Sequence, residues 1–309
     1  MRTALAAATL GLALAAAAPA AAEPDWQPVQ RLLDLSGLAW LGDDRFLVVH
    51  DAKNPDELDR VRVSFLKTPA SLEGMLWAPL DVAFPDTPSS DLESASRVPG
   101  APLVLLVESN DEAGEHRRIF LARVDDDGVA VEGVVPWTGF SDAFNVEATA
   151  VAPAGDGFLF LWAERASGQQ NTVIRWSPMT LDPFAIAAPT GSAPFALPED
   201  LVDAEGAPLY SRPIVAMDID AAGGLHVAAA YDPEGTVADP DNGPFRSALM
   251  RIGTVSAAGV ALDPTVEMTA VADGLKIESV AAMERDGETW LFIGTDDENY
   301  GGTLRRLPH

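Results

Sequence analysis

Residues 145–150 read Asn-Val-Glu-Ala-Thr-Ala, and variants of this short pattern recur along the chain. In each variant an apolar residue is followed by a glutamate or a small residue, and then by alternating apolar positions. The other copies start at Leu35, Leu92, Val215 and Ile277. Neighbouring copies lie roughly 55 to 70 residues apart, which is enough for a four-stranded propeller blade and its loops.

Each copy is followed by the same kind of segment. A turn rich in Gly, Asp or Pro precedes a run of strand-forming residues, and a further strand-like run comes after a polar loop. The first strand-forming runs after each copy are residues 46–50, 103–107, 158–163, 225–231 and 290–295. No segment with a helical period interrupts the series. Five copies of one unit therefore predict an all-β fold, a five-bladed β-propeller.

The two ends of the chain fit a closed ring. The last copy leaves room for only three strands, and residues 29–33, before the first copy, read as a strand. In propellers the chain start often completes the last blade, which leaves no sheet edge open. We therefore expect residues 29–33 to pair beside residues 303–307. The alternative is a six-bladed propeller, whose extra blade would fit only in residues 182–213, a stretch that reads as a long loop.

The first residues resemble a secretory leader. Arg2 is followed by an Ala-rich apolar run, and small residues stand before Glu23. We predict a signal peptide at 1–22, a single β-propeller domain at 23–309, and a periplasmic or secreted location. No later segment is long and apolar enough to span a bilayer. The sequence has no cysteine, so we expect no disulfide.

The composition is strongly acidic, with 47 Asp and Glu against 20 Lys and Arg and a formal net charge of −27. Such a surface repels nucleic acids and anionic lipids. We therefore expect no nucleic-acid partner and no membrane span, and we expect a monomer.

The repeat predicts where many of the acids lie. The innermost strand of a blade and the next strand form a hairpin, so the start of the first and the end of the second share one face. Glutamates occupy the starts in three copies, and acids follow the strand-forming runs. The starts are Glu93, Glu147 and Glu278, and the ends are Asp51, Glu108, Glu164, Asp232 and Asp296. The sequence thus predicts a ring of carboxylates at one mouth of the central channel.

Such a ring requires a counter-charge, since two like charges 4 Å apart repel by roughly 4 kcal/mol at an effective dielectric of 20. Carboxylate oxygens without cysteine or clustered histidine favour calcium over zinc. The alternative is that these acids cap strands and turns and face solvent separately. The candidate contacts for an anionic ligand are Lys53, Arg165, Arg246 and Lys276.

Three of these stretches resemble a known family. Residues 145–150, the acidic run Gly-Thr-Asp-Asp-Glu-Asn-Tyr at 294–300, and Asp-Leu-Glu-Ser at 91–94 are similar to motifs of the esterase-like phytase family. The resemblance implies a secreted propeller, a divalent metal and hydrolysis of phosphate esters. A second likeness is to calcium-dependent nucleotidases, which are also propellers with a glutamate-lined centre.

Two functions follow as hypotheses. The first is an exported calcium-binding propeller without catalytic activity, which binds a small anionic ligand or a protein partner. The second is a calcium-dependent phosphoric ester hydrolase, although the sequence shows no catalytic base. The two differ in whether basic side chains converge on the glutamates, because a phosphate ester needs an anion clamp.

Overall fold

The computed structural model describes residues 24–51, 60–68, 74–109, 116–137, 145–198, 212–231, 245–297 and 301–307. The predicted leader, Lys53 and Asp232 lie outside these ranges. Within them, no helix is long and apolar enough to cross a membrane.

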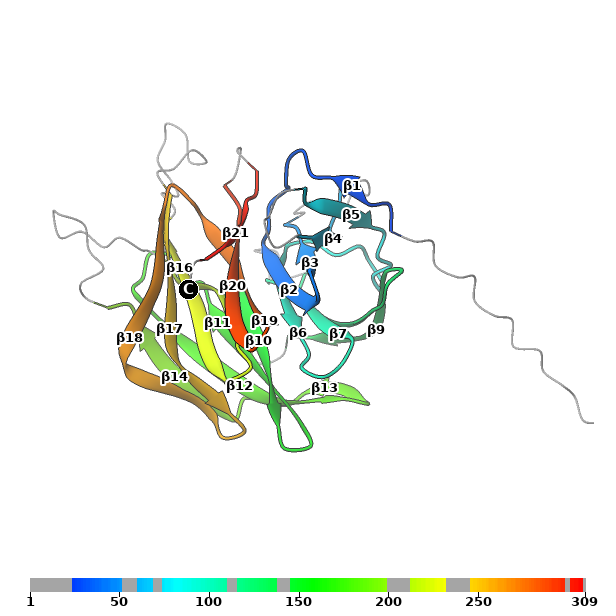
Figure 1. The fold of residues 1–309 in the computed structure, drawn as a ribbon. Coiled ribbons are helices and arrows are strands. Elements are labelled where there is room, and N and C mark those ends of the chain that lie inside the picture. The colour runs from blue at the N-terminus through cyan, green and yellow to red at the C-terminus, as the bar shows by residue number, and fades with distance from the viewer. Residues whose placement is uncertain are drawn as a thin grey trace, which may run out of the picture.

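The described strands form five antiparallel sheets, which confirms the five-bladed β-propeller (Figure 1). Blade 1 contains, from the axis outward, β2 (Gly37–Gly42), β3 (Arg45–Val49), β4 (Val63–Lys67), β5 (Leu76–Leu80) and β1 (Gln27–Pro28). Blade 2 contains β6 (Leu92–Arg97), β7 (Leu103–Glu108), β8 (Arg118–Val124) and β9 (Val129–Pro136). Blade 3 contains β10 (Val146–Ala154), β11 (Gly157–Glu164) and β12 (Asn171–Leu181), with β13 (Phe184–Ile186) and β14 (Gly191–Ala196) outside them. Blade 4 contains β15 (Arg212–Ile219), β16 (Gly224–Tyr231), β17 (Arg246–Ser256) and β18 (Gly259–Asp273). Blade 5 contains β19 (Ile277–Arg285), β20 (Glu288–Thr295) and β21 (Leu304–Arg306).

The innermost strands of neighbouring blades touch one another around the axis. Their side chains are mostly small, so the backbones approach closely enough for direct hydrogen bonds between blades. The Thr149 hydroxyl of blade 3 lies 2.8 Å from the Ser94 hydroxyl of blade 2. The backbone N–H of Ala282 in blade 5 donates to the Asp218 carboxylate of blade 4 at 2.7 Å. These bonds fix the blades relative to one another at the channel.

The apolar core lies between the blades. Alternate residues of a strand point to opposite faces of its sheet, so each blade offers one apolar face to the blade before it and one to the blade after it. The buried apolar residues accordingly fall into five clusters, one between each pair of neighbouring blades. The largest of them are Trp162, Phe46, Phe65, Phe120 and Phe160.

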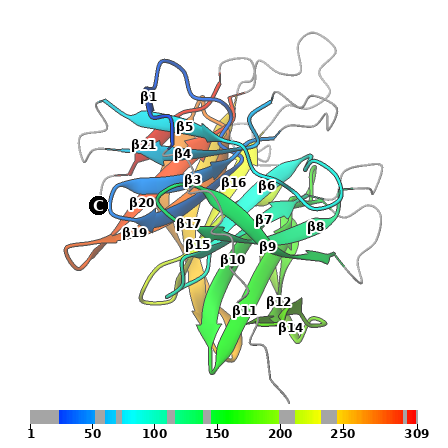
Figure 2. The same ribbon diagram turned by 90° about the vertical axis from the view of Figure 1, so that its right-hand side faces the viewer.

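The ring closes differently from the prediction in one respect. An isolated bridge joins Leu32 to Gly302, beside the last blade, but residues 29–33 do not form a full fourth strand there. Instead β1 pairs with the outer strand of blade 1, where the two lie together in both ribbon views (Figures 1 and 2). Gly302 permits the bridge, because a Cβ at this position would collide with the Leu33 carbonyl oxygen.

The interpretation of residues 182–213 as one long loop is wrong. Two strands in this stretch, β13 and β14, both pair with β12 and extend the outer edge of blade 3. The described part of this stretch before β15, residues 182–198, therefore extends blade 3 and supplies no sixth blade. Its prolines do not prevent this, since an outermost strand can accept proline where its N–H would face solvent.

Candidate metal centre at the channel mouth

The three glutamates of the repeat, named here the glutamate ring, lie at irregularities in the innermost strands. The pairing register shifts between Leu92 and Ser94, between Val146 and Ala148, and between Ile277 and Ser279. Glu93, Glu147 and Glu278 are the residues at these shifts. A β-bulge takes one residue out of the ladder and re-aims its side chain, which explains why a poor strand former recurs at this position.

All three side chains are buried, and their charges act on one another. The glutamates are exposed by only 8%, 5% and 8% respectively. Burial raises the pKa of Glu93 well above its usual range, and Asp51, Asp91, Glu278 and Glu147 raise it further. Glu93 therefore lies where a negative charge is costly and a positive one would be favoured.

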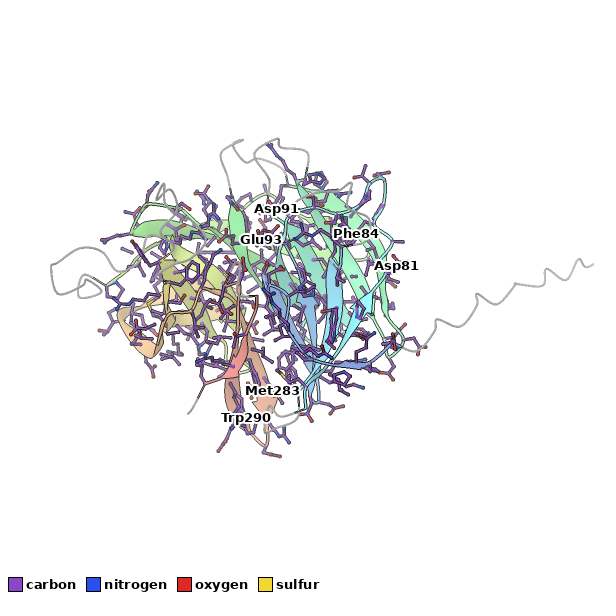
Figure 3. All side chains as sticks on the ribbon, turned by 90° about the horizontal axis from the view of Figure 1, so that it is seen from above. Asp81, Phe84, Asp91, Glu93, Met283 and Trp290 are labelled. Atoms are coloured by element: carbon purple, nitrogen blue, oxygen red, sulfur yellow. The ribbon has the colours of Figure 1, made fainter. Side chains whose placement is uncertain are left out.

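Glu93 belongs to a compact group of acids, named here the acidic trio, with Asp51 and Asp91. One oxygen from each of the three carboxylates lies within 4.8 Å of the others. Asp51 follows β3 of blade 1, Asp91 directly precedes β6 of blade 2, and Glu93 is the second residue of β6. Seen from above, Asp91 and Glu93 lie in the inner part of the molecule, whereas Phe84 and Asp81 lie farther out (Figure 3).

Asp91 is held in an unusual conformation. Its φ of 58° falls in the left-handed region, which is uncommon for a residue other than glycine. The Ser109 hydroxyl donates to the Asp91 carboxylate, and the Ser109 N–H donates to the Asp91 carbonyl at 3.0 Å. Aspartate is one of the few residues other than glycine that enter this region readily, and the two bonds from Ser109 hold the Asp91 carboxylate beside Glu93.

Three basic side chains, named here the basic trio, converge on the other members of the glutamate ring. Arg165 donates to Glu147 at 2.7 Å, and the Lys276 ammonium lies 2.9 Å from a Glu278 oxygen. Arg212 forms a longer ion pair of 3.9 Å with the same Glu278 oxygen. Arg212 begins the irregular stretch of β15, the place in blade 4 that corresponds to the glutamate bulges of blades 2, 3 and 5.

Glu147 lies between the two groups. Burial raises its pKa, and Arg165, Arg212 and Lys276 oppose that rise. One carboxylate oxygen is bonded to Arg165, but the buried Oε2 has no hydrogen-bond partner among the described residues. Buried acceptors are normally satisfied, so this oxygen is suited to a cation or a hydrogen-bond donor from a ligand.

The remaining predicted residues lie in other surroundings. Glu108 is fully buried and accepts from Arg118 at 2.6 Å and from the Ser89 hydroxyl at 2.8 Å, an arrangement that stabilises the chain before β6. Burial raises the pKa of Glu164, which lies at the end of β11 outside the acidic trio. Asp296 lies 3.5 Å from Lys276, and Arg246 pairs with Asp273 on the outermost strand at 2.6 Å.

Sequence reasoning missed Asp91 and Arg212. Asp91 stands in the motif Asp-Leu-Glu-Ser, but the sequence does not mark it as a site residue, because its left-handed backbone cannot be seen there. The fourth copy of the repeat aligns at Val215 and Ala216, so Arg212 falls before the matched position and is not recognised as a site residue. The ladder shows that the irregular stretch begins at Arg212 and ends at Ala216.

Comparison with known proteins supports the fold and goes no further. No protein-family model and no curated protein matches the sequence. Among solved structures, an endo-arabinase from Bacteroides thetaiotaomicron is 11% identical with a TM-score of 0.51, over 94% of this chain and 97% of that one. An exo-1,5-α-L-arabinanase from a bovine ruminal metagenomic library is 13% identical with a TM-score of 0.50, over 89% and 92%. The resemblance to the esterase-like phytase family thus gains no support beyond its short motifs.

Proposed function

We propose that the channel mouth binds a divalent cation, calcium, and uses it to hold a small ligand. The observation that carries the proposal is the acidic trio, which brings three carboxylates together where burial and mutual repulsion make their charges costly. Asp51, Asp91 and Glu93 would hold the ion. Hard carboxylate oxygens are the donors that calcium takes.

The surroundings of the acidic trio support the same assignment. The unpaired Oε2 of Glu147 is a feature for which the fold alone gives no reason. When bound, the cation would neutralise the trio and polarise an oxygen of the ligand. Glu147 and Arg165 of blade 3 and Lys276, directly before blade 5, would orient that ligand.

Calcium-dependent hydrolysis of a phosphate ester is the second candidate. It is favoured by one observation, namely that Arg165, Arg212 and Lys276 converge on the glutamate ring, as an anion clamp requires. Arg246 takes no part, because its partner is Asp273.

The first experiment measures the melting temperature with calcium, with magnesium and after chelation. A ligand that binds only the folded state at a hundred times its Kd adds roughly 2.7 kcal/mol. We expect calcium to raise the melting temperature by several degrees and chelator to reverse the gain. Magnesium should do less, because it demands octahedral geometry and gives up water reluctantly.

Two variants localise the effect. Glu93→Gln removes a charge from the acidic trio, whereas Glu267→Gln removes one from an exposed position on β18. The calcium gain should disappear in the first and persist in the second. If calcium raises the melting temperature of both variants equally, the cation binds somewhere other than the channel mouth. Release of nitrophenol from p-nitrophenyl phosphate by the calcium-loaded protein then tests the second candidate.

A further inference from the structure

The charges at the channel mouth are unevenly divided. The acidic trio lies on the side of blades 1 and 2, and the basic trio lies on the side of blades 3, 4 and 5 together with Glu147, Glu278 and Asp296. Six acids against three bases leave a formal charge of −3 on these described residues. One divalent cation changes that charge to −1, so the channel mouth carries no net positive charge even with the cation bound.

Each base is already engaged by an acid. Arg165 bonds to Glu147 at 2.7 Å, Lys276 to Glu278 at 2.9 Å, and Arg212 pairs with Glu278 at 3.9 Å. The basic trio therefore holds the glutamates in place and offers little net positive charge to a ligand. A phosphate dianion would bring the mouth to −3 even with the cation bound, in a site where burial strengthens repulsion.

The unpaired Oε2 of Glu147 sets a second requirement. This oxygen is an acceptor on a side chain that is only 5% exposed, so an occupant should present a donor to it. A hydroxyl group can donate to a carboxylate and can also ligate calcium through its oxygen. The dianion of a phosphate monoester has only acceptors, and the inorganic dianion offers a single P–O–H donor, so a phosphate satisfies Oε2 less readily than a polyol with several hydroxyl groups.

We propose that the calcium-loaded mouth binds a neutral, hydroxyl-rich ligand, a saccharide or polyol, in preference to a phosphate. The inference rests on the proposed cation site. Hydroxyl groups of the ligand would reach the cation and Glu147, and the paired bases would donate to its remaining oxygens.

The test uses calcium-loaded full-length protein on an array of neutral oligosaccharides and sugar alcohols, followed by calorimetry with the tightest of these and with inorganic phosphate. We expect at least one neutral compound to bind in calcium and to be released by chelator, with phosphate binding more weakly. Tighter binding of phosphate than of every neutral compound, or no binding of any neutral compound, overturns the inference.

A charge variant adds an independent measurement. Glu278→Gln removes the acid shared by Arg212 and Lys276, so phosphate should bind at least about tenfold more tightly than to the wild type. Glu267→Gln is the control and should leave phosphate binding unchanged. An unchanged phosphate affinity in Glu278→Gln would also overturn the inference.

The melting experiment separates the two proposals. If calcium raises the melting temperature but no neutral compound binds, the cation site stands and only the ligand class is wrong. If calcium leaves the melting temperature unchanged, the cation site itself is wrong, and the ligand class falls with it.

Discussion

At the scale of single residues, the ionised Glu93 side chain destabilises the folded protein when no cation is bound. Its folded pKa lies well above that of the unfolded chain, so stability from this group is present at acidic pH and is lost as the pH rises through the folded pKa. Without a cation at pH 8, Glu93→Gln should therefore increase the free energy of unfolding, measured with urea. A variant less stable than the wild type under these conditions would show that the glutamate is already compensated.

Asp218 gives a second prediction, away from the channel mouth. Burial raises its pKa to about 6, against hydrogen bonds from the Ala282 and Ile219 N–H groups that lower it. The stability that protonated Asp218 contributes is fully present below about pH 4 and is lost as the pH rises through 6. The free energy of unfolding should fall by up to roughly 3 kcal/mol over this range.

The test for Asp218 is a pair of stability curves. Asp218→Asn stays neutral but offers one acceptor where the carboxylate accepts from two N–H groups, so it should lose stability at every pH. Its unfolding free energy relative to the wild type should nevertheless rise between pH 4 and pH 7. Parallel curves for the two proteins would show that Asp218 does not titrate in this range.

At the scale of strands, Gly37 controls how closely blades 1 and 2 approach. A Cβ at this position would lie 2.5 Å from a Val49 methyl carbon and 2.6 Å from the Ala95 nitrogen. Gly37→Ala should cost roughly 1–3 kcal/mol of unfolding free energy. It should also reduce the calcium-induced gain in melting temperature, because the two blades carry the acidic trio between them.

Gly128→Ala is the matched control for that prediction. Gly128 lies before β9, and a Cβ at this position would have no atom within 4 Å, so this substitution should leave both the stability and the calcium response nearly unchanged. Equal effects of the two substitutions would contradict the role of close packing between the blades.

The recurrence of a glutamate can be recognised from the sequence, because every copy of a repeat is placed by the same rotation about the axis. The repeat therefore predicts that Glu93, Glu147 and Glu278 lie near one another. The exceptions to the repeat cannot be predicted in this way. The position of the Asp91 side chain depends on a left-handed backbone. The position of Arg212 depends on an irregular stretch that is longer in blade 4 than in the other blades. Side-chain pairing, such as that of Glu108 with Arg118, depends on contacts that no period encodes.

At the scale of the whole molecule, the net charge of −27 is distributed over a fold without a single disulfide. Self-repulsion of this size weakens the compact state and is screened by salt. Sodium chloride should therefore raise the melting temperature of the cation-free protein, measured from low to physiological ionic strength. The rise should be smaller with calcium bound, and a fall with added salt would mean that attractive ion pairs dominate.

The contact that closes the ring also joins the beginning of the chain to its end. The Ser279 hydroxyl donates to the Leu35 carbonyl at 2.6 Å, across 244 residues of sequence. During synthesis, blade 1 therefore cannot pack against blade 5 until almost the entire chain has emerged. The closing interface is the last to be completed on the ribosome, and a chain that stops before blade 5 would leave the apolar faces of blades 1 and 4 exposed to other nascent chains.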